Sequence, residues 1–573
     1  MSSSQLIDGS FKYVAEFDPT LKKGSIFAFQ LDTAGNFNTV KSWDAGELLR
    51  QLPSTSRQVI TNNRATGVPF NWDTLPNAYR NLLKSGSSPA MSNAKAEGIV
   101  NYLRGDTDNE EPNGQRFQPR SISNLLGTVV NSTPWIQLPS NAYYFDAYFP
   151  ATGVQSYLNY ATSTYSRPKT LWVGANDGML HGFNAGTGAP IISYVPGLLA
   201  NRLNALTERN ASIVAGVDGS PFTADVLRSA PAGQTATWAT YLFSSLGRGG
   251  KGVFALDVSK VGDLTEANAA NIFKWQFSDA NDSDIGNIVG EYGRSQFSNQ
   301  AIPVVRLNNN KFAVALPNGL NSSNGQSSIF LLTADGPPAG TTTWTLGTNY
   351  YKLTTTVADT SNGMTGMNWL DVDNNGTVDF MYGTDIKGNV WKFDLTSSNP
   401  NLWRSAFVST TTGLPVPFYV AKDANNVNLP ISTSPVFGFP RVGGVVVSFG
   451  TGSAIRSGDF PKEAVTQRMY GILDRTGIAS GTTTVTLPTG TSTLVQRTTT
   501  VSTTESVKIS STPVVDYRNQ DGWYFDFPGT SEWCSALHLT ELGALVSPQL
   551  ENSYPRLRLA HETPPARFYF LDP

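Results

Sequence analysis

Cysteine and histidine are both scarce in this chain of 573 residues. Cys534 is the single cysteine, and the three histidines, His181, His538 and His561, are far apart in the sequence. One thiol cannot form an intramolecular disulfide framework or a cysteine-based zinc site. Scattered histidines are typical of structural roles rather than of a shared metal. The sequence therefore excludes the soft-ligand metal chemistry that cysteine and histidine clusters support.

Charge and long apolar runs are also lacking. Charged residues make up 15% of the chain, with 41 basic and 44 acidic side chains and a net charge of −3. No basic patch for nucleic acid is expected from such a balance. No stretch approaches 18 consecutive apolar residues, so no transmembrane helix is expected. The start, Met1-Ser2-Ser3-Ser4, has no apolar segment after it and does not resemble a signal peptide.

Turn-forming and aromatic residues are abundant instead. The 52 glycines, 34 prolines and 11% aromatic residues are typical of an all-β protein with elaborate turns. A chain this rich in Thr, Asn and Gly without a leader is expected to be a fragment of a longer exported protein. Its length exceeds the roughly 250 to 300 residues of one ordinary core, so we expect repeats or several domains.

One pattern recurs along the chain: an apolar strand, a turn with glycine, a second strand with an aromatic residue, and then Asp or Asn. The copies fall at residues 24–35, 171–184, 241–258, 311–336, 379–395, 445–474 and 543–572. A single hairpin cannot bury its apolar face alone, so such units stack around a ring. The pattern predicts a seven-bladed β-propeller, one domain over residues 1–573. A pair of β-sandwiches is the alternative.

Seven units give about 82 residues each, well above the roughly 40 to 45 of a plain blade, so long insertions are expected. The largest is predicted at residues 40–165. Helical spacing of apolar residues occurs there at Ala45–Leu52, Leu75–Lys84 and Asn93–Leu103. Asp73 and Ser92 are the predicted N-caps of the second and third helices.

The segment from Asp371 to Asp379 has the spacing of a calcium-binding loop. Its predicted ligands are Asp371, Asp373 and Asn375 at the first, third and fifth places, the Thr377 backbone carbonyl at the seventh and Asp379 at the ninth. Gly376 stands at the sixth place, where the turn is sharp. Ca²⁺ is a hard cation that takes 6 to 8 oxygen ligands, and this set offers oxygen only. The sequence therefore predicts a calcium site.

The loop departs from an EF-hand, because Tyr382 occupies the twelfth place, where a bidentate Glu belongs, and strand-like residues follow. We therefore predict a calcium loop inside a β protein. An Asp/Asn-rich turn without an ion is the alternative. Two other acidic segments, 106–110 and 279–284, lack the glycine at the sixth place and are predicted to be solvated loops.

Several tracts together resemble the C-terminal domain of the PilC/PilY family of type IV pilus biogenesis factors and tip-associated adhesins. They are residues 11–15, 42–45, 102–106, 126–134, 172–183 and 249–257. The resemblance covers nearly the entire chain. It implies a modified, quinoprotein-like seven-bladed propeller whose calcium loop regulates pilus extension and retraction. It also implies an exported protein at the cell surface, pilus or outer membrane, with minor pilins, the pilus machinery and a host receptor or glycan as partners.

The resemblance gives Arg104-Gly105-Asp106 two interpretations. Integrin binding by such a tripeptide has been proposed in the family. The other interpretation is a helix C-terminus in which Gly105 is the left-handed cap.

Two further functions stay open beside a calcium-modulated binding module. A propeller quinoprotein dehydrogenase would also use calcium, but such enzymes resemble one another in an adjacent cysteine pair, which one cysteine cannot supply. No Ser/His/Asp or Cys/His arrangement has convincing spacing either, so we expect no enzyme. A carbohydrate or matrix binder would use aromatic residues of the insertion, such as Trp135, Tyr143, Tyr144 and Tyr148.

Overall fold

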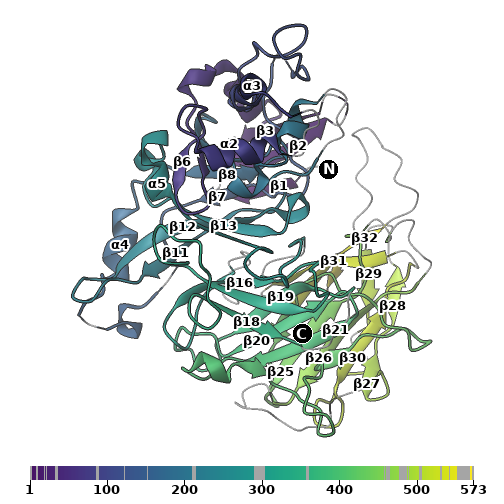
Figure 1. Ribbon diagram of the computed structural model, residues 1–573. Helices are drawn as coiled ribbons and strands as arrows, with labels where there is room; N and C mark the ends of the chain where they lie inside the picture. Colours follow the sequence, from purple (N-terminus) through teal and green to yellow (C-terminus); the bar gives the residue numbers. More distant parts are fainter. Residues whose placement is uncertain are drawn as a thin grey trace. The chain divides into compact units, whose positions relative to one another are not determined.

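The described residues form seven sheets (Figure 1). The computed structural model describes the chain apart from residues 1–2, 8–10, 19, 21, 33–35, 86–89, 122, 143, 151, 209–213, 290–302, 356–360, 457–458, 460–464, 477–486, 488–489, 502–505, 511, 530–531, 541–542, 551–567 and 571–573. The chain divides into two compact units. The first unit comprises residues 1–282 and 334–345, and the second comprises 283–333 and 346–573.

The first unit holds three of these sheets. The first has the order β1 (Ser3–Ile7), β2 (Phe11–Asp18), β3 (Lys23–Gln30), β4 (Trp43–Asp44). The second has the order β6 (Gly67–Pro69), β5 (Val59–Asn62), β10 (Pro190–Tyr194), β9 (Leu180–Asn184), β8 (Thr170–Gly174), β7 (Trp135–Gln137). The third has the order β11 (Phe222–Arg228), β12 (Thr237–Ser245), β13 (Gly252–Asp257), β14 (Phe273–Ser278).

The second unit holds the other four sheets. The fourth sheet has the order β15 (Val304–Arg306), β16 (Phe312–Pro317), β17 (Ser328–Thr333), β18 (Tyr350–Thr354). The fifth has the order β19 (Met364–Leu370), β20 (Phe380–Asp385), β21 (Asn389–Asp394), β22 (Arg404–Ser405), and β23 (Tyr419–Val420) also pairs with β21. The sixth sheet has the order β24 (Val436–Gly438), β25 (Val445–Gly450), β26 (Arg468–Asp474), β30 (Gly522–Asp526), β27 (Leu494–Gln496). The seventh has the order β28 (Thr499–Val501), β29 (Ser506–Ile509), β33 (Phe568–Phe570), β32 (Gly543–Leu550), β31 (Glu532–Thr540).

Each predicted copy of the repeated pattern lies in a different sheet. Six copies contain two consecutive strands that pair with each other, namely β8 with β9, β12 with β13, β16 with β17, β20 with β21, β25 with β26 and β32 with β33. The first copy corresponds to β3, which pairs with β2 and β4. The expected β architecture is confirmed, and the number of blades stays a prediction. Gly35 and Asp572, at the ends of two copies, lie outside the described residues.

Helices occur where the insertion predicts them. The α-helices are α1 (Ala45–Gln51), α2 (Asn77–Lys84), α3 (Asn93–Leu103), α4 (Tyr157–Ser163) and α5 (Ala269–Ile272). Short 3₁₀ helices are η1 (Ser54–Ser56), η2 (Asp146–Tyr148), η3 (Gly197–Leu199), η4 (Leu203–Thr207), η5 (Gly247–Gly249), η6 (Val261–Asp263), η7 (Glu266–Asn268) and η8 (Pro400–Leu402). Within the described part of the chain, no helix has the length and apolar character that a membrane span requires.

The predicted caps of the second and third helices have different outcomes. The Ser92 hydroxyl accepts a hydrogen bond from the Lys95 amide and caps α3, as predicted. The Asp73 prediction is wrong, because α2 begins at Asn77 after Pro76 and no side chain caps it. Proline fixes an extended entry into the first turn without needing a capping side chain.

The part of the insertion from β5 to α3 packs on the second sheet of the first unit. Strand β5 adds in parallel to β10, with Ser193 opposite Val59 and Tyr194 opposite Ile60. Buried residues of α2 and α3, including Leu83 and Ile99, belong to the same apolar cluster as Tyr194. Helices α2 and α3 contact each other, and both contact η4. An apolar core thus holds the insertion in place.

Candidate metal centre

The predicted calcium loop connects two paired strands of the second unit. Strands β19 and β20 are antiparallel, and Leu370 lies opposite Phe380, so residues 371–379 form a closed loop at the strand ends. The Asp379 amide donates to the Leu370 carbonyl at 2.9 Å and closes the loop base. Asn374 and Gly376 have φ angles of 58° and 81°. These left-handed positions turn the chain back on itself, and they suit Asn and Gly.

Three carboxylates converge inside this loop. Asp371, Asp373 and Asp379 each offer an oxygen atom, and these atoms all lie within 4.8 Å of one another. Asp379 is buried at 4% exposure, Asp371 is half-buried and Asp373 is exposed. The three predicted acidic residues are therefore brought together, with one edge of the cluster open to solvent.

Backbone amides bond all three carboxylates, and Asp373 accepts from the Asn375 amide at 3.1 Å. The two oxygens of Asp371 accept hydrogen bonds from the Asn375 amide at 3.2 Å and the Gly376 amide at 2.8 Å. Asp379 accepts from the Val372 amide at 2.9 Å. Burial raises the pKa of both Asp371 and Asp379, and repulsion between neighbouring carboxylates raises it further. A bound cation would relieve that repulsion.

Asn375 and Thr377 lie in the same loop, bonded to each other. The Asn375 side-chain oxygen accepts from the Thr377 amide at 2.8 Å and from the Thr377 hydroxyl. The Asn375 amide group donates to Asp373 at 3.0 Å. This local network orders the loop through its polar side chains. Their role as ligands stays a prediction.

Asn308 also belongs to this site, and sequence reasoning missed it. It follows β15, and its side-chain amide donates to the Val378 carbonyl at 2.8 Å and to the Leu395 carbonyl at 3.0 Å. Its oxygen accepts from the Thr377 hydroxyl at 2.8 Å. Asn308 thus attaches the loop to the neighbouring sheet of the same unit. The run Asn308-Asn309-Asn310 indicates a turn, but nothing in the sequence indicates its partner 69 residues away.

The residues present fit a hard divalent cation. Each carboxylate oxygen has two lone pairs, so the oxygens that accept one amide hydrogen bond keep a further coordination site. The three carboxylates match the oxygen-only preference of Ca²⁺. The Asn375 side-chain oxygen already accepts two hydrogen bonds from Thr377, so it would have to give one up to become a ligand. Tyr382 cannot serve as the missing twelfth ligand, because it is buried and its hydroxyl donates to Asp474 at 2.6 Å. The candidate metal centre is therefore a nine-residue loop rather than an EF-hand.

The other two acidic segments are built differently. In the first, Glu110 pairs with Arg120 at 2.7 Å. In the second, Asp284 is buried and pairs with Lys352 at 2.7 Å. For Glu110 and Asp284 the expectation of a solvated loop is wrong, because both residues are buried and their carboxylates form ion pairs. Among the residues that the structure describes, the loop at residues 371–379 is the one place where three such ligands gather.

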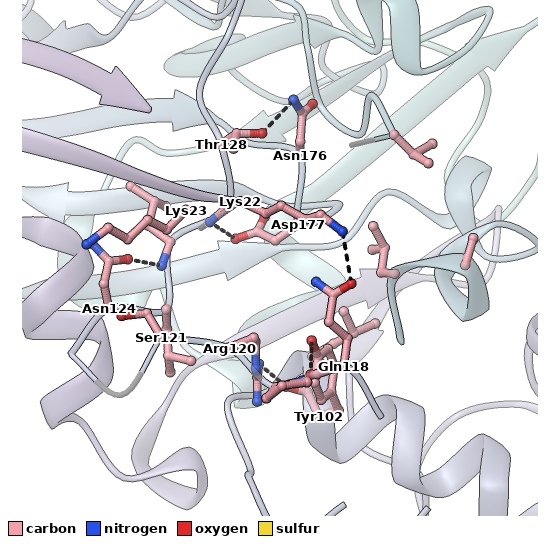
Figure 2. Close-up of a pocket in the computed structure, with 18 of the residues that line it drawn as sticks. Lys22, Lys23, Tyr102, Gln118, Arg120, Ser121, Asn124, Thr128, Asn176 and Asp177 are labelled. Atoms are coloured by element: carbon pink, nitrogen blue, oxygen red, sulfur yellow. Dashed lines mark hydrogen bonds between the residues drawn. The ribbon is translucent and has the colours of Figure 1, made fainter. Parts of the chain in front are cut away.

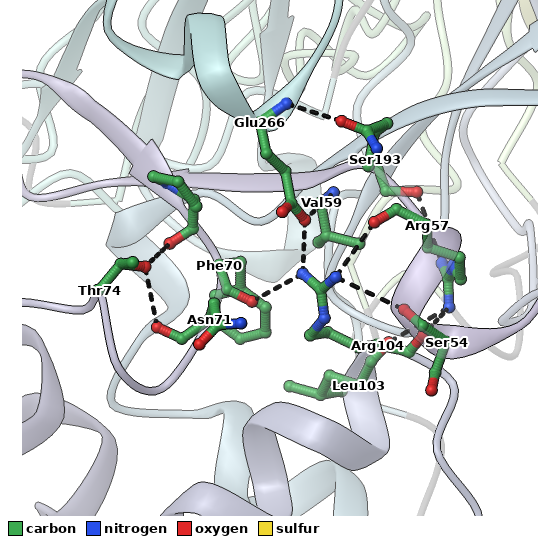
Figure 3. Close-up of polar contacts among 12 residues, drawn as sticks. Ser54, Arg57, Val59, Phe70, Asn71, Thr74, Leu103, Arg104, Ser193 and Glu266 are labelled. Carbon is green, nitrogen blue, oxygen red and sulfur yellow. Dashed lines mark hydrogen bonds and ion pairs between the residues drawn. The ribbon is translucent and has the colours of Figure 1, made fainter.

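The Arg-Gly-Asp tripeptide is a helix terminus with a buried arginine (Figure 3). Gly105 has φ 106°, its amide donates to the Tyr102 carbonyl, and the Asp106 amide donates to the Asn101 carbonyl. These two bonds are the Schellman pattern, so the prediction of a left-handed cap is confirmed. Arg104 is 7% exposed.

The Arg104 guanidinium is fully engaged inside the first unit. It donates to the Phe70 carbonyl at 3.0 Å, to the Arg57 carbonyl at 3.1 Å and to Glu266 at 2.6 Å. An integrin-type receptor would need this cation at an exposed loop tip. The packing in Figure 3 therefore speaks against the integrin interpretation.

A Ser, His and Asp do come together in the first unit. The two ring nitrogens of His181 lie 2.9 Å from the Ser193 hydroxyl and 3.0 Å from Asp177. Ser193 and His181 are 4% and 1% exposed, so neither is accessible to a substrate. The arrangement ties the turn between β8 and β9 to β10 through a buried hydrogen-bond chain.

The aromatic residues suggested for a carbohydrate site are largely packed. The Trp135 indole donates to Thr223 at 2.9 Å, and Tyr144 stacks on Trp238 with ring centroids 5.2 Å apart. Tyr148 is 36% exposed, and Tyr143 lies outside the described residues. Trp135 and Tyr144 are thus packing residues, whereas Tyr148 is exposed beside the exposed Phe145. A carbohydrate site at these residues stays a prediction.

Comparisons with known proteins place the chain in a family. The PilY1 beta-propeller domain family matches residues 126–512. The type IV pilus biogenesis factor PilY1 of Pseudomonas aeruginosa strain UCBPP-PA14 is 28% identical over 484 residues, which are 79% of this chain and 38% of that protein. A PilY1 homolog of Xylella fastidiosa strain Temecula1 is 28% identical over 476 residues, or 83% of this chain and 33% of that protein.

A solved structure agrees with these matches. The C-terminal domain of Pseudomonas aeruginosa PilY1 superposes with a TM-score of 0.55 at 26% identity, covering 72% of this chain and 82% of that domain. The chain spans about two fifths or less of the length of the curated relatives described here. The fold is a β-propeller, and the chain belongs to the PilY1 beta-propeller domain family.

Proposed function

We propose that this chain is a calcium-binding propeller module that acts by binding in type IV pilus biogenesis. The observation that carries the proposal is the convergence of Asp371, Asp373 and Asp379, whose oxygens lie within 4.8 Å of one another. All three carboxylates accept hydrogen bonds from backbone amides before any ion arrives. The relatives are named as pilus biogenesis factors, which supports the biological setting.

Calcium would act through the stiffness of the loop. Without the ion, the carboxylates repel one another, and the loop is held mainly by amide hydrogen bonds and by Asn308. With the ion, the charge is neutralised and the ends of β19 and β20 are fixed together. The ion shifts the population only toward the conformation that it binds more tightly. A partner that prefers the ordered loop would then bind more tightly when calcium is present.

In this role the module would regulate pilus extension and retraction, twitching motility and attachment to surfaces. Its partners would be minor pilins or other parts of the pilus machinery, and a host receptor or glycan would be a further target. The protein would work outside the cytoplasm, at the cell surface or on the pilus. No bond is made or broken, and the residues of the loop serve as ligands only.

The test of the site is the substitution Asp373→Ala. Asp373 is exposed, so the propeller should stay folded while the loop loses one of its three carboxylates. We expect calorimetry to detect no calcium binding by the variant and an unchanged circular dichroism spectrum. Asp73→Ala, at an exposed carboxylate outside the loop, is the matched control and should bind calcium as the parent does. If Asp373→Ala binds calcium as tightly as the parent chain, the assignment of the calcium site to residues 371–379 is wrong.

The role in the pilus is tested separately in cells. A full-length protein with Asp373→Ala should change the balance of extended and retracted pili, and the Asp73→Ala protein should not. Normal pilus dynamics in cells whose purified variant no longer binds calcium would leave the metal site intact but refute its regulatory function.

A further inference from the structure

Two cavities of the first unit differ greatly in size. The cavity in Figure 2 measures about 110 Å³, and the Lys22 ammonium on its lining donates to the Gln118 side-chain oxygen at 3.3 Å. A larger cavity measures about 810 Å³. Pockets for drug-sized ligands measure roughly 300 to 1,000 Å³, so the larger cavity has room for a short oligomer.

Short segments of the first unit line the larger cavity. They are α4 with its flanking residues, the end of β11, the start of β12, the end of β13, and then η6, η7 and α5. Its lining residues all lie between positions 155 and 272, so none of them belongs to the calcium loop of the second unit.

Hydroxyl and carboxamide groups are abundant on this lining. Eight of the 18 lining residues are Ser, Thr, Asn or Gln. Pockets for drug-sized ligands are lined mainly by hydrophobic and aromatic side chains instead. Hydroxyl and carboxamide groups both donate and accept hydrogen bonds, as the hydroxyl groups of a sugar do. The lining therefore favours a ligand that carries many hydroxyl groups.

The charged residues of the lining nearly balance one another. The cations are Arg167, Arg228 and Lys260, and the two carboxylates are Asp257 and Asp263. Arg228 pairs with Asp257 at 3.6 Å, and the Arg167 guanidinium donates to neutral acceptors. A cleft attracts an ion when charges of one sign line it. This lining carries both signs, so it favours a ligand without net charge.

A chain of contacts fixes one part of the lining before any ligand arrives. The Tyr160 hydroxyl lies 2.7 Å from the Thr240 hydroxyl, which also accepts from Arg167 at 2.8 Å. Arg167 donates to the Ser259 carbonyl at 3.4 Å, and the Ser259 hydroxyl donates to Asp257 at 2.6 Å. Polar groups that are already held in place lose little freedom when a ligand binds.

Other lining side chains are free to bind a ligand. Lys260, Asp263 and Asn271 are exposed, and their side chains form no hydrogen bond or ion pair with another residue of the described chain. Val261 and Ile272, their neighbours in the sequence, add apolar surface to the lining. A ring with hydroxyl groups at its edge and carbon atoms on its face matches this combination.

We propose that the larger cavity is a binding site for a short, neutral oligosaccharide. The Asn271 carboxamide hydrogen-bonds to sugar hydroxyl groups, and Val261 and Ile272 contact the apolar face of a sugar ring. None of the aromatic residues considered above for a carbohydrate site lines this cavity. The inference rests on the attachment to surfaces proposed above and gives it a location, but it does not depend on calcium.

The first experiment screens the folded chain on an array that carries neutral oligosaccharides beside acidic ones. The neutral glycan with the strongest signal is then titrated by calorimetry in solution. We expect neutral glycans to bind in preference to acidic ones. An array without any bound glycan, or with acidic glycans only, would overturn the proposal.

Two substitutions at exposed lining positions locate the site. Asn271→Ala removes a free carboxamide and should weaken binding of the titrated glycan about fivefold to tenfold. Ser166→Trp places an indole in the cavity and should abolish binding. The matched controls are Asn159→Ala and Thr162→Trp, at exposed positions of α4 that do not line the cavity, and both should bind as the parent does.

Melting curves of all four variants should match that of the parent chain. Equal binding by the parent and Ser166→Trp would show that the glycan sits elsewhere and that the assignment is wrong. A short Ser-Asn peptide with blocked ends is titrated as well, and tighter binding of this peptide than of any glycan would make the cavity a peptide site instead. The Asp373→Ala chain should bind the glycan normally, which separates this site from the calcium site.

Discussion

A buried ion pair lies in the core of the second unit. Lys392 and Asp474 are each 1% exposed and form an ion pair at 2.8 Å. The Tyr382 hydroxyl donates to the same Asp474 oxygen, and the Lys392 ammonium lies 4.3 Å from the Phe380 ring centroid. Burial lowers the pKa of Lys392, which shows how much the charged lysine depends on its partner.

Removing one partner of this pair should be costly. We expect Asp474→Ala to lower the free energy of unfolding by about 3 to 5 kcal/mol, because it leaves a buried ammonium without its counter-ion. Glu47→Ala, which breaks the exposed pair with Lys41, should cost about 1 kcal/mol or less. Chemical denaturation followed by fluorescence compares the two variants. Equal midpoints would show that the buried pair does not stabilise the fold.

At the scale of elements, the turn after β15 contacts the proposed calcium loop between β19 and β20, which belongs to the neighbouring sheet. Asn308 bonds the loop, whereas its neighbour Asn309 donates to the Tyr351 hydroxyl at 2.8 Å and points to another contact. The two adjacent side chains thus have separate partners within the same turn. Ligand-supporting contacts of this kind typically change metal affinity by about 10- to 100-fold.

Asn308→Ala should therefore weaken calcium binding by about 10- to 100-fold without abolishing it, because the loop carboxylates remain. Asn309→Ala is the matched control from the same turn and should keep the affinity of the parent. Calorimetric titration with calcium provides the measurement. If both substitutions weaken binding equally, the effect comes from the turn as a whole rather than from the Asn308 contacts.

A buried carboxylate fastens helix α4 to the third sheet. Asp225 on β11 accepts hydrogen bonds from the hydroxyls of Tyr157 at 2.8 Å, Thr240 at 2.7 Å and Ser140 at 3.0 Å. Burial raises the pKa of Asp225, and these hydrogen bonds, with the charge of Arg167, offset part of the increase. The folded chain therefore holds this proton more tightly than the unfolded chain does.

This pKa sets the sign of a pH dependence. Protonated Asp225 contributes fully to the stability of the fold below about pH 3.9, the pKa of Asp in an unfolded chain. This contribution is lost as the pH rises through the higher pKa of Asp225 in the folded chain. Asp225→Asn should therefore flatten the fall in melting temperature as the pH rises from acid to neutral. Asp263→Asn, at an exposed position, should leave the slope unchanged. Identical slopes in the parent and Asp225→Asn would contradict the assignment.

The sequence predicts those elements whose signals are local. Apolar runs around glycine turns give six pairs of strands. Ser92 is recognised because its capping bond spans three residues. Asp73 misleads, since Pro76 starts the helix further along the chain. Asn308 escapes prediction because its partners are remote in the sequence. His181 and Ser193 are only twelve residues apart, and they meet because they lie opposite each other on the paired strands β9 and β10. Spacing within one loop brings the three carboxylates together correctly, but it cannot reveal what supports them.

At the scale of the whole molecule, the chain consists of two compact units, and the calcium loop belongs to the second. A ligand that binds only the folded state stabilises the part that it binds, by about 2.7 kcal/mol at a concentration 100 times its dissociation constant. Calcium should therefore act on the second unit selectively.

Hydrogen exchange followed by mass spectrometry can test this selectivity. We expect calcium to slow exchange in β19, in β20 and at the turn containing Asn308, and to leave peptides from β11 to β14 unchanged. The Asp373→Ala chain should show no calcium effect in any peptide. Slower exchange throughout the first unit would show that the ion acts across both units.

Residues 334–345 belong to the first unit although the second unit flanks them in the sequence. The Trp275 indole donates to the Ala334 carbonyl at 2.8 Å, and the Trp344 indole donates to the Gln276 carbonyl at 2.9 Å. No single cleavage of the polypeptide can separate the halves cleanly. A hybrid gene joined at residue 283 would pair β14 of one relative with the Trp344 segment of another, and the Trp344 contact with Gln276 would be lost or altered. Recombination between relatives should therefore favour exchange of the whole propeller.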